Sequence, residues 1–471
     1  MSKNIFRYMY IPLPSAVERL KERGNLAEAE VCLRNLMESA ERSPEEKQRF
    51  YAEREILRRL PGEYPYTRGE ALKLMRRYIP DFAEERFDAL VAEGRILWRY
   101  LEGEPHYFGR FFDSLCKTDP YFAGEAAKQG HLIPGSDWSL LQKSAEKMRC
   151  SGEFSVRLRV RAGLRLNDSL YRGGAVLRAS LPLVRVTAEQ SDIQLETLSA
   201  GGQAGAADAE QRVVFWEESL QENHDFTLQY SLLHTEQYQD IYGIAETMQA
   251  GSGDIYRSGQ ERAEEVGPET VEETVHPLPF PESAYIRTLA GRLTEGVTEP
   301  LCKAKRFYDF ITEQVRYSFM PSYFCLDRMA ERCASDRVGD CGIQALLFLS
   351  LCEAAGIPAH WESGLKTEPG FIGAHDWTRF YTEQYGWRAV DLSYGGAAWR
   401  RGDEAMHRFY FGNIDPWRVA ANVRFMGETG FPEPEFRADP YDNQLGELEL
   451  DGRGLRYGEF THFYSQECFE R

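Results

Sequence analysis

The feature that most constrains the fold is an almost unbroken apolar run from Ile343 to Cys352. Only Gln344 and Ser350 are polar within it, so a helix here is apolar nearly all round and belongs in the centre of a fold. The run ends at Gly356-Ile357-Pro358, where glycine suits the residue after a helix and proline prevents its continuation. The sequence therefore predicts a buried central helix.

Cys341 stands at the start of this helix. In the first turn, the unpaired backbone N–H groups and the positive end of the helix dipole favour thiolate over thiol. Cys341 is therefore a candidate nucleophile. Asp340, the residue before it, is expected to cap the helix rather than to take part in chemistry.

Two strands are predicted downstream, at His375–Tyr381 and Trp387–Leu392, because both stretches are rich in aromatic and β-branched residues. Since side chains alternate between the faces of a strand, an antiparallel hairpin could place His375 and Asp391 side by side. A helix-tip cysteine, a histidine that accepts its proton and an aspartate that orients the imidazole form a nucleophilic triad. Asp391 could instead simply begin the turn that follows it.

Four separated elements occur in an order that resembles the transglutaminase-like superfamily, and its bacterial members in particular. The spacing is 34 residues from Cys341 to His375 and 16 from His375 to Asp391, and the resemblance covers roughly residues 284–420. It implies a papain-like core in which Cys341 is the nucleophile, His375 the base and acid, and Asp391 the orienting carboxylate. The four elements are Gly339-Asp340-Cys341, Ala355–Ala359, His375-Asp376-Trp377, and Gly386-Trp387 with Asp391.

Other site residues are expected around this triad. One oxyanion donor would be the backbone N–H of Cys341, and the second a side chain upstream, with Tyr317 and Tyr323 as candidates. Trp377, Tyr317 and Tyr323 are also the candidate substrate-binding residues. His360 is an alternative base, but its neighbourhood offers no orienting partner.

Composition limits the partners and cofactors. With 56 basic and 74 acidic side chains the net charge is −18, which argues against nucleic acid and anionic membranes as partners. The N-terminus has no signal-peptide core and no apolar run reaches membrane-span length. The nine cysteines lack paired spacing, which favours reduced thiols, a cytoplasmic location and no zinc site. No phosphate-binding glycine loop is present, so nucleotide hydrolysis has no support. No metal or other cofactor is expected.

The chain is predicted to be a multidomain α+β protein, whose core packs a central helix on an antiparallel sheet. Residues 1–150 form a helical region whose hairpin is similar to a winged helix, and residues 151–275 form a β-sandwich, as the strict alternation of Phe154–Arg161 indicates. Residues 276–471 form the core and end in a β-hairpin. A polar linker is expected at 249–275 and a proline-rich bridge at 276–281.

The resemblance implies a thiol-dependent hydrolase that cleaves amide bonds of a peptide or protein, as a peptidase or deamidase, through a Cys341 thioester. Two alternatives stay open: a protein-glutamine transamidase that cross-links its substrates, and a non-catalytic peptide- or glycan-binding protein. A protein partner that binds the N-terminal helical region is a further expectation.

Overall fold

The computed structural model describes residues 5–249, 278 and 283–470, and its fold is α+β. The described chain divides into two compact units, one of residues 135–315 and 341–471, the other of residues 5–134 and 316–340. The expected linker and bridge, with the domain boundary between residues 275 and 276, lie outside the described residues except for Gln249 and Leu278.

The first unit contains a predominantly antiparallel β-structure and the helices that surround the core sheet. Its helices are α8 (Trp138–Ser151), α9 (Ile241–Gln249), α11 (Ala284–Leu293), α12 (Pro300–Gln314), α14 (Cys341–Ala354), α15 (Leu392–Arg401) and α16 (Glu404–Phe409). Its strands are β4 (Glu153–Leu166), β5 (Val176–Pro182), β6 (Gln190–Leu198), β7 (Gln203–Ala204), β8 (Val213–Ser219), β9 (Phe226–Gln237), β12 (Ala359–Glu368), β13 (Phe371–Thr382), β14 (Gly386–Val390), β15 (Phe411–Gly412), β16 (Arg418–Asn422), β17 (Glu447–Leu450), β18 (Arg453–Gly454) and β19 (Phe460–Glu470).

The core of this unit is a five-stranded antiparallel sheet of order β15-β14-β13-β12-β16. Helix α14 packs on β12 and β13 and is buried over most of its length, as its apolar run predicts. The ring of Phe348 on α14 meets Phe380 of β13 with centroids 6.2 Å apart. Helix α12 packs against α14 in turn. The predicted central helix on an antiparallel sheet is therefore confirmed.

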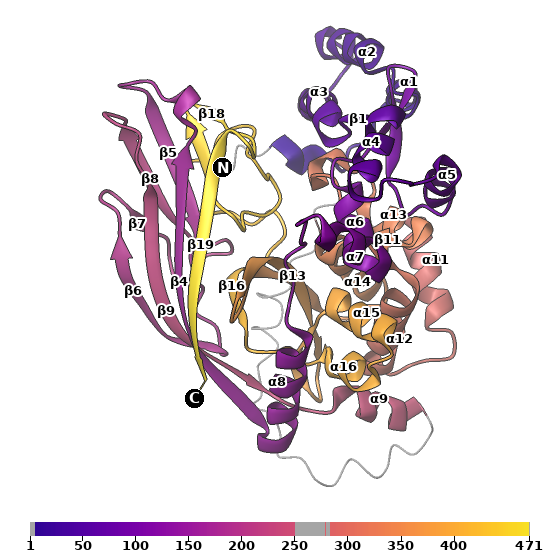
Figure 1. Cartoon of the computed structure of the whole chain (residues 1–471), viewed down its shortest axis with the longest axis vertical. Helices are drawn as coiled ribbons and strands as arrows, with labels where there is room; N and C mark the ends of the chain where they lie inside the picture. Colours follow the sequence, from indigo (N-terminus) through magenta and orange to yellow (C-terminus); the bar gives the residue numbers. More distant parts are fainter. Residues whose placement is uncertain (1–4, 250–277, 279–282, 471) are drawn as a thin grey trace. The chain divides into compact units, whose positions relative to one another are not determined.

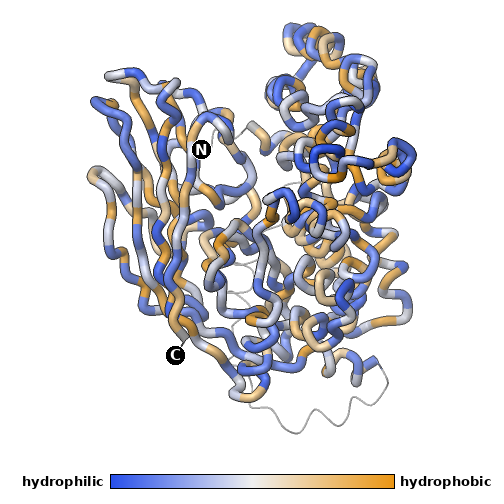
Figure 2. The backbone as a smooth tube through the Cα atoms, viewed as in Figure 1, coloured by the Kyte–Doolittle hydropathy of each residue, from blue (hydrophilic) through white to orange (hydrophobic). Residues whose placement is uncertain are grey.

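Two further sheets form the sandwich-like part of the same unit, with strand orders β19-β4-β9-β6 and β18-β17-β5-β8-β7. Buried and less buried residues alternate through most of β4, and Figure 2 shows the matching alternation of hydrophobic and hydrophilic residues along these strands. Trp216 of β8 packs edge-on against Phe226 of β9, at 5.9 Å between ring centroids, and joins the two sheets.

The C-terminal strands complete these two sheets instead of closing the core. Strands β17 and β18 form the expected hairpin, but β17 pairs with β5, and β19 pairs with β4 along eleven residues, Phe460–Glu470. In Figure 1 the yellow β19 runs beside the purple β4, although most of the sequence separates them. The predicted boundaries at 151–275 and 276–471 therefore need correction, because the unpaired edges of β4 and β5 recruit strands from the chain terminus.

The second unit is mainly helical. Its helices are α1 (Ser15–Glu22), α2 (Leu26–Glu38), α3 (Pro44–Glu63), α4 (Arg68–Tyr78), α5 (Glu84–Ala92), α6 (Phe111–Thr118), α7 (Pro120–Lys128) and α13 (Met329–Asp336). Its strands are β1 (Tyr66–Thr67), β2 (Trp98–Leu101), β3 (Glu104–Tyr107), β10 (Arg316–Tyr317) and β11 (Val338–Gly339).

Ser43 caps the start of helix α3. Its side chain accepts from the N–H of Glu46, while Glu46 accepts from the Ser43 N–H, a complete capping box. Helix α3 is followed by β1, α4, α5 and the β2–β3 hairpin, and the three strands form a sheet of order β1-β3-β2. This connectivity fits the winged-helix-like arrangement. Arg68 pairs with Glu84 and Asp88, so acidic neighbours offset its charge.

Residues 316–340, expected in the core, fold with the N-terminal helices instead. Polar contacts anchor this segment: the Ser322 hydroxyl donates to Glu63 at 2.6 Å, and the Lys21 ammonium lies 2.8 Å from Asp327. Residues 5–134 therefore do not form their compact unit alone, because residues 316–340 complete it.

Within the described ranges, no helix is long and apolar enough to cross a membrane.

Candidate active site

Cys341 is the first residue of α14, as predicted, and its side chain is partly exposed. Its sulfur donates to Oδ2 of Asp376 at 3.1 Å. Gln444 holds the other oxygen of the same carboxylate through its side-chain amide. A carboxylate that accepts the thiol hydrogen stabilises the thiol form, whereas the helix terminus favours the thiolate that the sequence predicts.

His375 and Asp391 come together, as the predicted hairpin implies. Strands β13 and β14 pair antiparallel, and Asp391 follows the last residue of β14. His375 Nε2 lies 2.7 Å from Asp391 Oδ2, and both side chains are buried. With Nε2 donating to the aspartate, the other ring nitrogen, Nδ1, is the one able to accept a proton.

Asp391 also begins a helix, in addition to its contact with His375. Its Oδ1 accepts from the backbone N–H of Tyr394 at 2.9 Å and caps α15, while its Oδ2 serves His375. The cap fixes one oxygen of the carboxylate and thereby the direction of the other. A turn after Asp391 was expected from the sequence, whereas helix α15 was not.

The electrostatics of this pair favour a neutral imidazole next to an ionised carboxylate. Burial lowers the pKa of His375 and outweighs the opposite effect of the Asp391 charge. For Asp391, burial alone would raise the pKa, but the charges of His375 and Arg418 together lower it below the ordinary range. A neutral imidazole is the form that accepts a proton from a thiol.

The sulfur of Cys341 bonds the residue next to His375 on β13. His375 and Asp376 are consecutive on β13, and it is Asp376 that accepts from Cys341. The catalytic roles of Cys341, His375 and Asp391 stay a prediction.

Trp377 lies in the core and not on a substrate-accessible surface. Its side chain is 2% exposed, its indole N–H donates to Glu362, and its ring packs near His375 with centroids 6.1 Å apart. A direct contact with substrate, as the sequence suggested, would require this buried ring to be uncovered. Trp377 packs beside the histidine, and a substrate-binding role for it stays a prediction.

Tyr317 and Tyr323 both belong to the second unit. Tyr317 lies on β10, opposite Gly339 of β11. The Tyr323 hydroxyl donates to Oδ1 of Asp340 at 2.7 Å, and the capping role expected of Asp340 stays a prediction. An oxyanion or substrate-binding role for either tyrosine stays a prediction.

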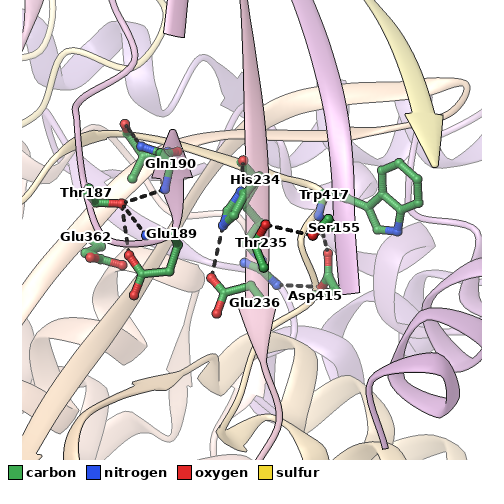
Figure 3. Close-up of polar contacts among 12 residues, drawn as sticks. Ser155, Thr187, Glu189, Gln190, His234, Thr235, Glu236, Glu362, Asp415 and Trp417 are labelled. Carbon is green, nitrogen blue, oxygen red and sulfur yellow. Dashed lines mark hydrogen bonds and ion pairs between the residues drawn. The ribbon is translucent and has the colours of Figure 1, made fainter. Parts of the chain in front are cut away.

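A buried charge network surrounds the strands that carry the histidine. Arg379 of β13 pairs with Glu362 at 2.9 Å and with Glu189 at 2.8 Å. His234 of β9 bonds Glu236 at 3.0 Å, and Figure 3 shows this pair together with Glu189 and Glu362. The pair of Arg379 and Glu189 joins the core sheet to the segment just before β6 inside the first unit.

His360 and a metal site are the alternatives to the triad that the sequence raises. His360 lies 3.6 Å from Glu362, but the Glu362 carboxylate is already engaged by Trp377 and Arg379. Across the part of the chain that the structure describes, no three His, Cys, Asp or Glu side chains gather in a way that could hold a metal ion.

Asp442 gives the protein a pH-dependent stability. Burial raises the pKa of this carboxyl from 3.8 to about 7, even though Asn422 donates to it. The folded state therefore binds a proton more tightly than the unfolded state, so stability is greatest below the unfolded pKa and falls as the pH rises toward 7. We expect the wild-type protein to lose about 2 kcal/mol of unfolding free energy between pH 5 and pH 8 from this group.

Urea unfolding across that pH range measures the effect, and Asp442→Asn should flatten the dependence. Asp208→Asn, at an exposed position of the same unit, is the matched control and should leave it unchanged. Equal pH dependence in wild type and Asp442→Asn would contradict the assignment.

Sequence reasoning missed two neighbours of the triad, Asp376 and Arg418. Asp376 stands next to His375 and was treated only as part of a strand. Arg418 is wholly buried and its Nη1 lies 2.7 Å from Asp391 Oδ2. The one available signal was the pair of opposite charges Asp415 and Arg418, three residues apart in an aromatic stretch, which suggests a local ion pair.

The fold and the site define an α+β protein with a papain-like core, in which a helix-tip cysteine lies near a buried histidine–aspartate pair. Residues 287–392 match the family model of the transglutaminase-like superfamily. The match includes Cys341, His375 and Asp391. It supports a papain-like thiol enzyme in general and does not specify the reaction.

Comparison with solved structures gives more distant similarities. A candidate cysteine protease from Cytophaga hutchinsonii is 15% identical with a TM-score of 0.39, and the match covers 68% of this chain and 92% of that one. The periplasmic domain of TgpA from Pseudomonas aeruginosa is 16% identical with a TM-score of 0.29, over 56% of this chain and 95% of that one. These values are too low to assign a substrate or a residue role. A comparison with curated proteins found no match.

Proposed function

We propose that the protein is a thiol-dependent hydrolase that acts on amide bonds of a peptide or protein substrate. The observation that carries this proposal is the buried pair of His375 and Asp391, 2.7 Å apart, on the strand whose next residue accepts from the Cys341 sulfur. A binding protein needs no such pair next to a cysteine. The family match over residues 287–392 supports the same chemistry.

The first half of the reaction forms a thioester. The Cys341 sulfur leaves Asp376, gives its proton to Nδ1 of His375 and attacks the carbonyl carbon of the substrate amide. The N–H groups at the start of α14 are placed to stabilise the negative charge that develops on the carbonyl oxygen. The His375 imidazolium then protonates the leaving amine, and Asp391 stabilises that imidazolium through Nε2.

The second half releases the acyl group. A water molecule gives a proton to His375 and attacks the thioester carbonyl, which yields a carboxylic acid and restores the thiol. If a primary amine replaces water, the same thioester gives a cross-linked or amine-modified product. The choice between these acceptors depends on how well the bound substrate excludes water.

Incubation with casein, with and without monodansylcadaverine, followed by mass spectrometry, distinguishes these outcomes. Deamidation adds about 1 Da to a glutamine, proteolysis gives shorter peptides, and transamidation attaches the fluorescent amine. We expect hydrolytic products in both arms and none with Cys341→Ser. The same products with Cys341→Ser would overturn the proposal, and the dansyl amine as the sole modification would favour the transamidase.

A further inference from the structure

Arg418 is a buried cation next to the proposed catalytic pair. It is the first residue of β16 and is fully buried. Its Nη1 lies 2.7 Å from Oδ2 of Asp391, an ion pair whose angle is not that of a hydrogen bond, and its Nη2 donates to Asp415 at 3.1 Å. The guanidinium also packs over the rings of Trp377 and Tyr394, at 5.3 and 5.2 Å.

One carboxylate oxygen of Asp391 contacts both Arg418 and His375. Oδ2 of Asp391 lies 2.7 Å from Nε2 of His375 and 2.7 Å from the guanidinium. An aspartate that faces only a histidine attracts a proton onto the ring. A permanent positive charge on that aspartate offsets part of this attraction, because arginine stays charged at every relevant pH.

We propose that Arg418 is a positioning residue that shares the Asp391 carboxylate with His375 and thereby keeps the imidazole neutral and able to accept the thiol proton. This inference rests on the proposed function, in which His375 is the base. Its consequence is that the cysteine and histidine rest as thiol and imidazole, not as a preformed ion pair. The hydrogen bond from the Cys341 thiol to Asp376 fits such a resting state.

Other charged groups near His375 also raise or lower its pKa. The ammonium of Lys366, on β12, lowers the pKa of His375 as Arg418 does, while Asp391 raises it. Lys366 is itself engaged by Asp415 at 2.6 Å and Glu368 at 3.1 Å. The Tyr394 ring packs edge-on against the imidazole at 5.0 Å, and Asp376 is the neighbouring carboxylate on β13.

The Asp391 side chain should keep its direction when Arg418 is replaced. Its Oδ1 accepts from the Tyr394 N–H at 2.9 Å and from the Ser393 hydroxyl at 3.2 Å, and neither contact involves the arginine. Loss of the guanidinium therefore removes a charge without releasing the aspartate from His375. We therefore expect replacement of Arg418 to increase the proton affinity of the His375 imidazole.

NMR titration of the histidine rings in the full-length protein tests this directly. The chain has nine histidines, and the signal that His375→Gln removes identifies His375. We expect Arg418→Gln to increase the proton affinity of His375 about tenfold, and Arg418→Lys, which keeps the charge, to stay within about twofold of wild type. Arg437→Met, which removes a buried arginine paired with Glu447 and distant from this carboxylate, is the matched control and should cause no change.

A single loss of charge could prevent folding, because it leaves Asp415 and Asp391 with fewer cations. The double variant Arg418→Gln with Asp415→Asn removes one charge of each sign and covers that case, with the same expected direction. If His375 in a folded Arg418→Gln or double variant titrates at or below the wild-type pH, the proposal is overturned.

This test does not depend on the proposed reaction, because it needs no substrate. If Cys341→Ser kept the casein-modifying activity while His375 shifted as expected, the proposed function would fail and the effect of Arg418 on the imidazole would stand. If Cys341→Ser were inactive and His375 did not shift, only the role of Arg418 would fail.

Discussion

Replacing Cys341 with serine is expected to reduce the proposed amide hydrolysis by about 10⁴-fold or more. Serine keeps the size and hydrogen-bonding capacity of the side chain but is a far weaker nucleophile unless a base activates it fully. His375→Gln should reduce activity to a similar level, because a triad acts as a unit and its losses are not additive. The casein assay under initial-rate conditions measures kcat/KM for each variant.

The matched control is Cys150→Ser, at an exposed cysteine of α8 in the same unit, and it should keep wild-type activity. Circular dichroism should show the same fold for all variants. Full activity in Cys341→Ser would contradict the nucleophile assignment, whereas full activity in His375→Gln alone would identify another base.

Replacing Lys21 with methionine is expected to destabilise the second unit by about 3–5 kcal/mol. The Lys21 ammonium is buried between two carboxylates, 2.7 Å from Glu53 and 2.8 Å from Asp327. Arg49 also pairs with Glu53, at 2.7 Å, so Glu53 keeps an ion pair in the variant. Asp327 is therefore the carboxylate that the replacement affects more. Because Asp327 belongs to the segment 316–340, this one lysine ties that segment to the N-terminal helices.

Hydrogen exchange followed by mass spectrometry measures the effect locally. Peptides from 316–340 in Lys21→Met should exchange about 100-fold faster or more, since each 1.4 kcal/mol is a factor of ten. Lys128→Met, which removes an exposed lysine paired with Glu125, should change exchange little, because surface ion pairs contribute little. Unchanged exchange in 316–340 would contradict the importance of this contact.

The local elements of the core could be predicted because their signals lie in short stretches of sequence. The apolar run after Cys341 needs only its composition to indicate a buried helix, and α14 is that helix. The alternation at 154–161 indicates a half-buried strand, and β4 covers it. The hairpin between His375 and Asp391 follows from its aromatic residues and its turn.

The charged residues under the site could not be predicted in the same way. Lys366 and Glu368 stand two apart on a strand, which is the usual pattern of a solvent-facing edge, yet both are buried and paired with one another. The burial of Arg418 could not be predicted for the same reason. A charge becomes buried only when partners from distant segments arrive to neutralise it, and one sequence does not reveal which segments meet.

The sequence by itself determined the central helix, the strands and the order of the cysteine, histidine and aspartate, because periodicity and spacing are local properties of the chain. Tertiary structure alone decided that β19 pairs with β4, that residues 316–340 fold with the N-terminal helices, and that Arg418 shares a carboxylate with His375. Each of these depends on the meeting of segments far apart in the chain, and their fit is settled by packing and charge pairing in three dimensions.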